Sequence, residues 1–131
     1  MAYVWVAIGG AIGSAARYGM SGVIANLTGG AFPYGTLFVN VTGGMLIGFL
    51  ATISGPDSRF IIPTAARIFM MTGICGGYTT FSTFSLETVN LMREGDWMRA
   101  SANVIGSVVL CLIAVLAGHA GALMLNRARG A

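Results

Sequence analysis

Charged side chains are scarce in this sequence, and lysine is absent from it altogether. Of its 131 residues only 8% are charged, whereas 56% are hydrophobic. An ordinary soluble domain is about 25% charged. A chain with so few charges cannot cover itself with a surface that water wets. The composition therefore favours an all-α integral membrane protein whose main solvent is lipid.

Two further scarcities exclude other classes of function. Seven arginines and four acidic residues leave a net charge of +3, and the arginines are spread along the chain. Because a nucleic-acid surface needs a basic patch or stripe, no nucleic-acid partner is expected. The only two cysteines, Cys75 and Cys111, lie in apolar stretches. They form neither a disulfide framework nor a zinc site, and we expect both to be buried small residues.

Long apolar runs predict four membrane passes, since a membrane helix needs about 20 mainly apolar residues. We expect them at about residues 3–26, 34–55, 60–92 and 98–126 of a single four-helix transmembrane domain, 1–131. Gly/Pro turns separate the first three, and a charged turn precedes the last. No basic residue precedes the first apolar run, so we interpret it as a retained helix and not a signal peptide. Both chain ends should then lie on one side.

The arginines divide almost evenly between the two ends of these passes. Four are expected near the side of the termini and three near the other: Arg59, Arg67, Arg127 and Arg129, against Arg93, Arg99 and Arg17. The difference in arginine and lysine between the sides sets the orientation of a membrane protein. So small a difference fits insertion both ways, as in an antiparallel dimer, and equally a single orientation fixed by the basic C-terminus.

Small residues recur at four-residue spacing in three of the passes. They are Gly9 and Gly13 in the first pass, Gly44 and Gly48 in the second, and Ala114, Gly118 and Ala122 in the fourth. Small side chains at this spacing let helix backbones approach closely inside a membrane. We interpret them as packing faces.

The third apolar run is interrupted by glycines and hydroxyl residues. Gly76 and Gly77 stand near its middle, and five hydroxyl residues occupy the seven positions 79–85. Adjacent glycines weaken a helix, and Thr79 or Thr80 is a good N-cap for a new one. The pattern predicts a broken helix with non-helical backbone at about 76–80, the alternative being a kinked but continuous helix. Such backbone needs protein or water around it, and its carbonyls could hold a cation.

Polar residues also recur at helical spacing in the last three passes. The stripes are Thr36 and Asn40; Thr83, Glu87 and Asn90; and Asn103, Ser107 and Cys111. Unpaired polar groups are costly in a membrane, so these must bond one another, the backbone, water or a permeating ion. Together with the broken helix they favour the lining of a pore for a small anion or polar solute. Phe81 and Phe84 either pack as core aromatics or face an anion with their positive ring edges.

Three stretches read together resemble one known family. They are Gly13–Tyr18, Gly35–Gly44 and Thr72–Glu87. All three are similar to the Fluc/CrcB fluoride channels, and with the four-pass layout the resemblance covers essentially the whole chain. It implies a fluoride-selective channel, with no enzyme activity, through which fluoride leaves the cytoplasm passively. It also implies an antiparallel dual-topology homodimer embedded in the lipid of a bacterial inner membrane.

The resemblance further implies roles for individual residues. Phe81 and Phe84 would line two fluoride pathways, with Asn40 donating its amide to the ion. Backbone carbonyls of Gly76 and Thr79 would hold a structural sodium ion at the dimer interface. The remaining expected pore residues are Ser82, Thr83, Glu87, Ser107, Arg17 and Thr36, the last of which shares a face with Asn40. Asn103 and Cys111 stand where some relatives carry a hydroxyl residue.

Two other functions fit parts of the sequence, and a third, a membrane enzyme, lacks the residues that it needs. A small dual-topology proton-coupled exporter of cationic compounds needs an ionisable group in its substrate site. The first acid in the chain is Asp57, in a predicted loop, which leaves Glu87 as the candidate. A non-transporting subunit explains the glycine packing but not the broken helix. A membrane enzyme needs a catalytic or metal set, and His119, the single histidine, has no carboxylate or cysteine cluster nearby.

Overall fold

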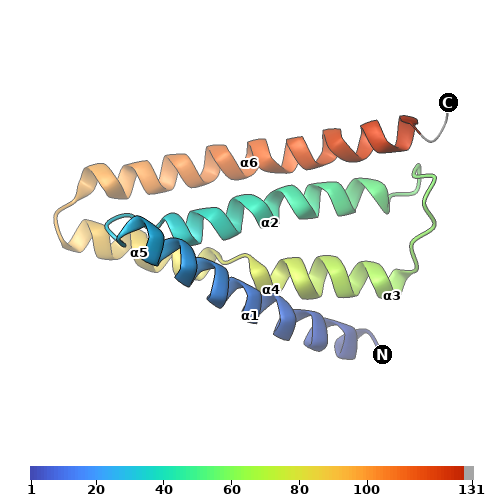
Figure 1. Ribbon diagram of the computed structural model, residues 1–131, viewed down its shortest axis with the longest axis horizontal. Coiled ribbons are helices and arrows are strands. Elements are labelled where there is room, and N and C mark those ends of the chain that lie inside the picture. The colour runs from blue at the N-terminus through green and yellow to red at the C-terminus, as the bar shows by residue number, and fades with distance from the viewer. Residues whose placement is uncertain (129–131) are drawn as a thin grey trace.

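The computed structural model, which describes residues 1–128, is a bundle of helical rods that run back and forth along its long axis, the first of them inclined to the others (Figure 1). The third rod is made of several segments, and the other three are single helices. The elements are α1 (Ala2–Thr28), α2 (Tyr34–Ile53), α3 (Thr64–Arg67), the π-helix η1 (Ile68–Cys75), α4 (Gly76–Tyr78), α5 (Phe81–Arg93) and α6 (Trp97–Ala128). The described residues contain no strand. Arg129, counted above among the basic residues of one side, lies outside them.

The chain reverses direction after each rod. The N-terminus and the end of α6 therefore lie at the same end of the bundle (Figure 1). Gly29 ends α1 in a left-handed conformation with φ of 76°, which glycine adopts without strain. The third rod begins at Thr64 and not near residue 60, because Pro63 disfavours helical backbone in the residue before it.

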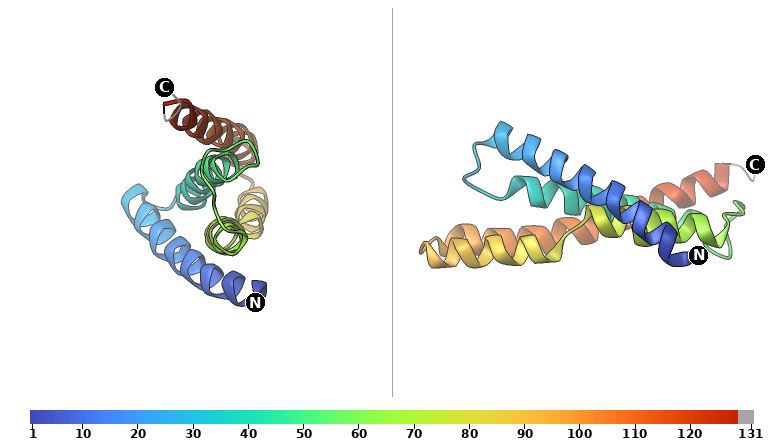
Figure 2. Two further views of the ribbon diagram at one scale, coloured as in Figure 1. Left: turned by 90° about the vertical axis from the view of Figure 1, so that its right-hand side faces the viewer. Right: turned by 90° about the horizontal axis from the view of Figure 1, so that it is seen from below.

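Glycines set the distances between the rods, as their spacing predicts. A Cβ atom added at Gly9 would lie 2.6 Å from the carbonyl oxygen of Phe69, so α1 packs backbone to backbone on η1. On the other side of the bundle, a Cβ at Gly118 of α6 would clash with the carbonyl oxygen of Met45 in α2. The aromatic rings of Trp5 and Phe69 meet edge to face at 6.1 Å beside the first contact. From this contact α1 crosses the other rods obliquely (Figure 2).

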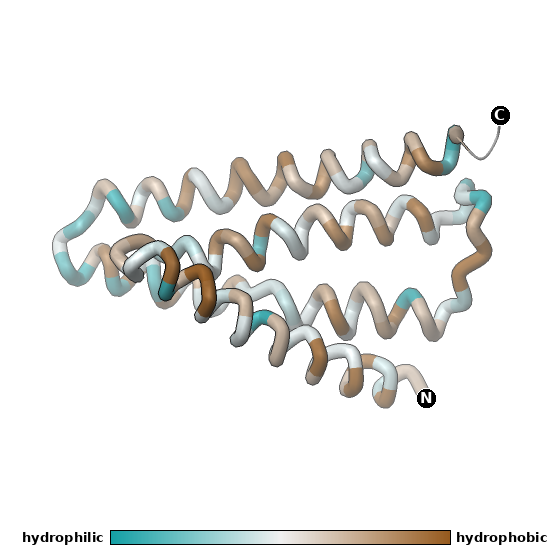
Figure 3. The backbone as a smooth tube through the Cα atoms, in the orientation of Figure 1, coloured by the Kyte–Doolittle hydropathy of each residue, from teal (hydrophilic) through white to brown (hydrophobic). Residues whose placement is uncertain are grey.

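Large apolar side chains point outward and small ones fill the interior. Leu112 and Leu116 of α6 are 62% and 65% exposed, whereas Val39, Cys75 and Asn103 are the largest fully buried side chains. Cys75 is buried as expected, but Cys111 is only half-buried. Hydrophilic positions gather at the two ends of the bundle, and the helix middles are mostly apolar (Figure 3). This inverted distribution is typical of a protein surrounded by lipid.

Two helices, α2 and α6, are long and apolar enough to cross a membrane on their own. The third rod contains no single helix long enough to cross a membrane, because its break leaves only 13 residues in α5. The helix α1 has 27 residues but is rich in glycine and alanine. The described chain is thus all-helical, with apolar helices suited to lipid.

Candidate functional site

The third rod is interrupted at two residues. Thr79 and Thr80 are both extended, with φ and ψ of −83° and 157° and of −151° and 118°. This non-helical segment is shorter than the expected residues 76–80, because Gly76–Tyr78 remain helical as α4. Gly77 stays in the helix because it packs on α1, where a Cβ would lie 2.6 Å from the carbonyl oxygen of Gly10. The helix is therefore broken and not merely kinked.

Thr80 begins the second half of the rod. Its hydroxyl oxygen accepts a hydrogen bond from the Thr83 backbone N–H at 3.2 Å, which makes it the N-cap of α5. The Thr80 hydroxyl also donates to Thr83 Oγ1 at 3.0 Å. The first backbone N–H groups of α5 therefore point into the break, where they favour negative charge.

The side chain of Asn40, on the neighbouring α2, forms hydrogen bonds with the backbone at the break. Its Nδ2 donates to the carbonyl oxygen of Thr80 at 2.9 Å, and its Oδ1 accepts from the Thr80 N–H at 2.7 Å. In a continuous α-helix that N–H would bond to the carbonyl of Gly76, four residues earlier. Asn40 thus replaces the missing helical partner, and a second hydrogen on its Nδ2 remains available to a ligand.

A groove of about 390 Å³, here called the aromatic groove, opens beside the break. Phe81 stands at this groove with 79% of its surface exposed. The rings of Phe81 and Phe84 lie 5.4 Å apart at an angle of 48°. The residues that line the groove are Asn40, Thr79, Thr80, Phe81, Phe84, Ser107, Val108, Cys111 and Leu112. Four of the residues expected in a pore, from α2, α5 and α6, are thereby brought together.

Two further grooves are lined by charged and hydroxyl side chains and are here called the polar grooves. The Arg17 groove, of about 500 Å³, is lined by Arg17, Thr36, Thr80, Ser82 and Thr83 among others. The Arg99 groove, of about 810 Å³, is lined by Thr36, Thr83, Glu87, Asn90, Glu94 and Arg99 among others. Thr36 and Thr83 line both, and Thr80 lines the Arg17 groove as well as the aromatic groove. Gly76 lines none of these three grooves, whereas Thr79 lines the aromatic one.

Glu87 is half-buried and lines the Arg99 groove. Its Oε1 accepts a hydrogen bond from the Thr36 hydroxyl at 2.8 Å. Its Oε2 is buried and has no hydrogen-bond partner among the described residues. The predicted stripe of Thr83, Glu87 and Asn90 is confirmed as one face of α5, since all three line the Arg99 groove.

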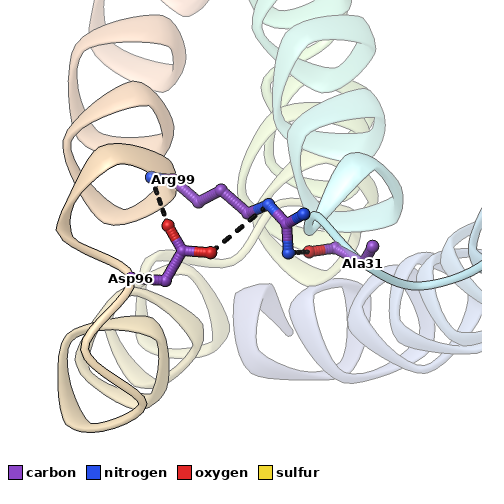
Figure 4. Close-up of polar contacts among 3 residues, drawn as sticks. All are labelled: Ala31, Asp96 and Arg99. Carbon is purple, nitrogen blue, oxygen red and sulfur yellow. Dashed lines mark hydrogen bonds and ion pairs between the residues drawn. The ribbon is translucent and has the colours of Figure 1, made fainter.

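Two turns at one end of the bundle are tied by a contact that sequence reasoning missed. Arg99 Nη1 donates to the carbonyl oxygen of Ala31 at 3.3 Å, and Arg99 Nε lies 3.4 Å from Asp96 Oδ2 (Figure 4). The other carboxylate oxygen of Asp96 accepts from the Arg99 backbone N–H at 3.0 Å and so caps α6. An acid followed by a base three residues later at a helix start was the available signal. Its partner in the first turn could not be deduced from spacing.

Comparison with known proteins identifies the family. The profile described as "CrcB-like protein, Camphor Resistance (CrcB)" matches residues 4–119. The chain belongs to the CrcB family. It is 52% identical over 128 residues to the fluoride-specific ion channel FluC of Opitutus terrae, which covers 98% of this chain and 97% of that protein. It is 54% identical over 126 residues to the channel of the same name from Rhodospirillum rubrum, covering 96% and 98%.

A third relative matches this CrcB-family chain from end to end. The fluoride-specific ion channel FluC of Methylocella silvestris is 50% identical over 131 residues, which is 100% of both chains. Full-length identity at this level, together with the exposed apolar helices, shows that the chain is a membrane protein.

Proposed function

We propose that this protein is a fluoride-selective channel through which fluoride leaves the cytoplasm passively. The observation that carries the proposal is the aromatic groove, where a broken helix, an asparagine amide and two phenylalanine rings meet. The names of the full-length relatives support it. No catalytic role is proposed for any residue.

The chemistry of the groove suits a small anion. One Nδ2 hydrogen of Asn40 is uncommitted, and the edges of aromatic rings carry partial positive charge. No carboxylate lines this groove. An anion there would exchange its water for amide, hydroxyl and ring-edge contacts, none strong enough to trap it. A negative-inside potential would drive it outward with about 2.3 kcal/mol per charge per 100 mV, so no energy source beyond that potential is needed.

The polar grooves supply a continuation of this path. Arg17 lines one of them beside Ser82 and Thr83, where it would attract an anion toward the break. No ion pair to Arg17 is present within the described part of the chain. Glu87 and Thr36 follow at the junction with the Arg99 groove.

We propose that the working unit is an antiparallel dual-topology homodimer with four passes per chain in a bacterial inner membrane. The aromatic groove is open along one side, and Phe81 would be covered by a second copy. The nearly even division of arginines between the two ends supports insertion in both orientations. A molar mass in detergent of twice 13.5 kDa is expected, and the mass of one chain would refute the dimer.

A structural sodium ion fits the broken helix. The N–H that would bond the Gly76 carbonyl in a continuous helix goes to Asn40, and Thr79 lies outside helical geometry. Freed carbonyl oxygens of this kind are what sodium takes in broken membrane helices. Gly76 and Thr79 would hold the ion, and two chains would supply twice the oxygens of one. The ion would supply fixed positive charge between the two copies.

The deciding experiment is fluoride release from vesicles that contain the purified protein, followed with a fluoride electrode. Potassium and valinomycin set the voltage, and chloride is the control anion. Fast fluoride release without chloride release, insensitive to a pH gradient, is expected. Release that requires a proton gradient would favour the proton-coupled exporter, for which Glu87 is the ionisable candidate. Release equal to that of empty vesicles, with the dimer intact, would favour a non-transporting subunit.

A matched pair of variants tests the aromatic groove itself. Phe81→Leu should reduce fluoride release because the leucine lacks a positive ring edge. Phe38→Leu removes a partly exposed ring from α2 that lines none of the three grooves, and should release fluoride at the wild-type rate. Equal rates for the two variants would remove the aromatic groove from the proposed pathway.

A further inference from the structure

Asn103 is the most deeply buried polar side chain among the described residues, with 2% of its surface exposed. It lies on α6 and bonds hydroxyl groups on two helices. Its Nδ2 donates to Thr88 Oγ1 of α5 at 2.9 Å, and its Oδ1 accepts from the Ser107 hydroxyl at 3.3 Å. Thr88 in turn donates to the carbonyl oxygen of Phe84 at 2.8 Å. A chain of hydrogen bonds thus links Ser107, at the aromatic groove, to the backbone of Phe84.

The direction of these hydrogen bonds decides whether Ser107 presents a proton or a lone pair to the groove. A serine hydroxyl has one proton and two lone pairs. While the proton points at Asn103, only lone pairs remain for an ion in the groove, and fluoride can only accept hydrogen bonds. The bond of 3.3 Å is long for a hydroxyl donor, which usually lies near 2.7–2.8 Å from its acceptor. Ser107 is therefore weakly held in the arrangement that is unfavourable for an anion.

Reversing the amide of Asn103 reverses the direction of these hydrogen bonds. The amide oxygen and nitrogen are similar in size, so a half turn about the last side-chain torsion exchanges them within the same space. Nδ2 then donates to Ser107 Oγ, and the Thr88 hydroxyl donates to Oδ1. The carbonyl of Phe84 keeps the backbone N–H of Thr88, four residues later in the same helix. Each of these buried groups retains a partner, and the Ser107 proton is free to point into the groove.

We propose that Asn103 is a positioning residue that sets whether Ser107 presents its lone pairs or its proton to an anion in the aromatic groove. The inference rests on the proposed function, because it gives Ser107 a role only if an anion passes there. Asn103 itself does not line the groove and acts through Ser107.

The test is a double-mutant cycle on fluoride release from vesicles, using Asn103→Leu, Ser107→Ala and the combination. Leucine has nearly the volume of asparagine but no hydrogen-bonding groups. Without Asn103, Ser107 is expected to bond back to the carbonyl of residue 103 on its own helix, so its proton is lost to the ion. Each single variant should therefore slow release about tenfold, the typical effect of one hydrogen bond to a charged group. The combination should be no slower than either single variant.

Independent effects would multiply instead, giving release about a hundredfold slower in the combined variant, and that result would overturn the inference. Wild-type release from Asn103→Leu would overturn it as well. If Asn103→Leu does not form a stable dimer, Asn103→Ala replaces it, because alanine also removes the amide that bonds Ser107. Ser101→Ala, at an exposed position of α6, is the control with wild-type release. If the wild-type protein itself released no fluoride, the proposed function would be refuted. Failure of the proposed function is thereby distinguished from failure of the inference about Asn103.

Discussion

Replacing Asn40 with leucine tests what keeps the helix break in its observed form. The Asn40 amide satisfies both backbone groups of Thr80, accepting from the N–H at 2.7 Å and donating to the carbonyl at 2.9 Å. Thr80 is only 7% exposed, so water has little access to the two backbone groups that would lose their partners. Leaving a buried polar group unsatisfied costs about 1–3 kcal/mol. Asn40→Leu should therefore lower the free energy of unfolding by about 2–6 kcal/mol.

The expected loss is measurable as a lower melting temperature in detergent. For a chain of this size it corresponds to a fall in Tm of roughly 5–20 °C. The same variant should also lose fluoride release from vesicles, because the uncommitted Nδ2 hydrogen is removed along with the bonded one.

The matched control is Asn126→Leu. Asn126 also accepts a hydrogen bond from a backbone N–H, that of Arg59 at 3.2 Å, but the contact is exposed at the end of the bundle. Its substitution should change stability by no more than about 0.5 kcal/mol. If Asn40→Leu melted at the same temperature as Asn126→Leu, the pinning of Thr80 would be wrong. If it also released fluoride normally, its proposed role as a donor in the pore would be wrong too.

Three further predictions follow from other contacts. Gly118→Ala should lower the free energy of unfolding by about 1–3 kcal/mol, because α2 leaves no room for a methyl group. Gly106→Ala, with open space around it, should instead raise the free energy of unfolding by about 0.5–1 kcal/mol in the same melting assay. Glu87→Gln should retain fluoride release. The glutamine amide oxygen can accept from Thr36, and its N–H₂ group places donors where the buried Oε2 of Glu87 has no partner. A large fall in release would show that the negative charge is required. Asp96→Ala should lower stability by about 0.5–2 kcal/mol through loss of the α6 cap, and an unchanged Tm would contradict that role.

The features that follow from local chemistry could be predicted from the sequence. Apolar runs locate the helices, and small residues four apart locate the faces where rods touch. A threonine before a polar stretch predicts an N-cap, and Thr80 is one. These predictions succeed because each depends on residues within a single helix or at its start.

The features that depend on how rods are placed against each other could not be predicted. Gly77 reads locally as a helix breaker, but it stays helical because α1 lies directly against it. Asn40 was expected to offer its amide to an ion, yet most of that amide is engaged by Thr80, 40 residues away. Arg99 reaches the carbonyl of Ala31 across 68 positions. Spacing along the chain contains no information about these separations.

The proposed pathway requires that an anion binds in the aromatic groove without being trapped there, and the protons around the break meet this requirement. Two hydroxyl groups that line the aromatic groove already donate: Thr79 to the carbonyl oxygen of Cys75 at 3.0 Å, and Ser107 to Asn103 Oδ1 at 3.3 Å. Apart from the uncommitted Nδ2 hydrogen of Asn40, an ion in the aromatic groove would have to draw hydroxyl protons away from existing partners. Breaking each existing hydrogen bond costs part of the free energy that the new contact contributes. Binding is then weak even though many donors lie nearby. Weak binding at successive sites is what lets an ion leave as readily as it enters.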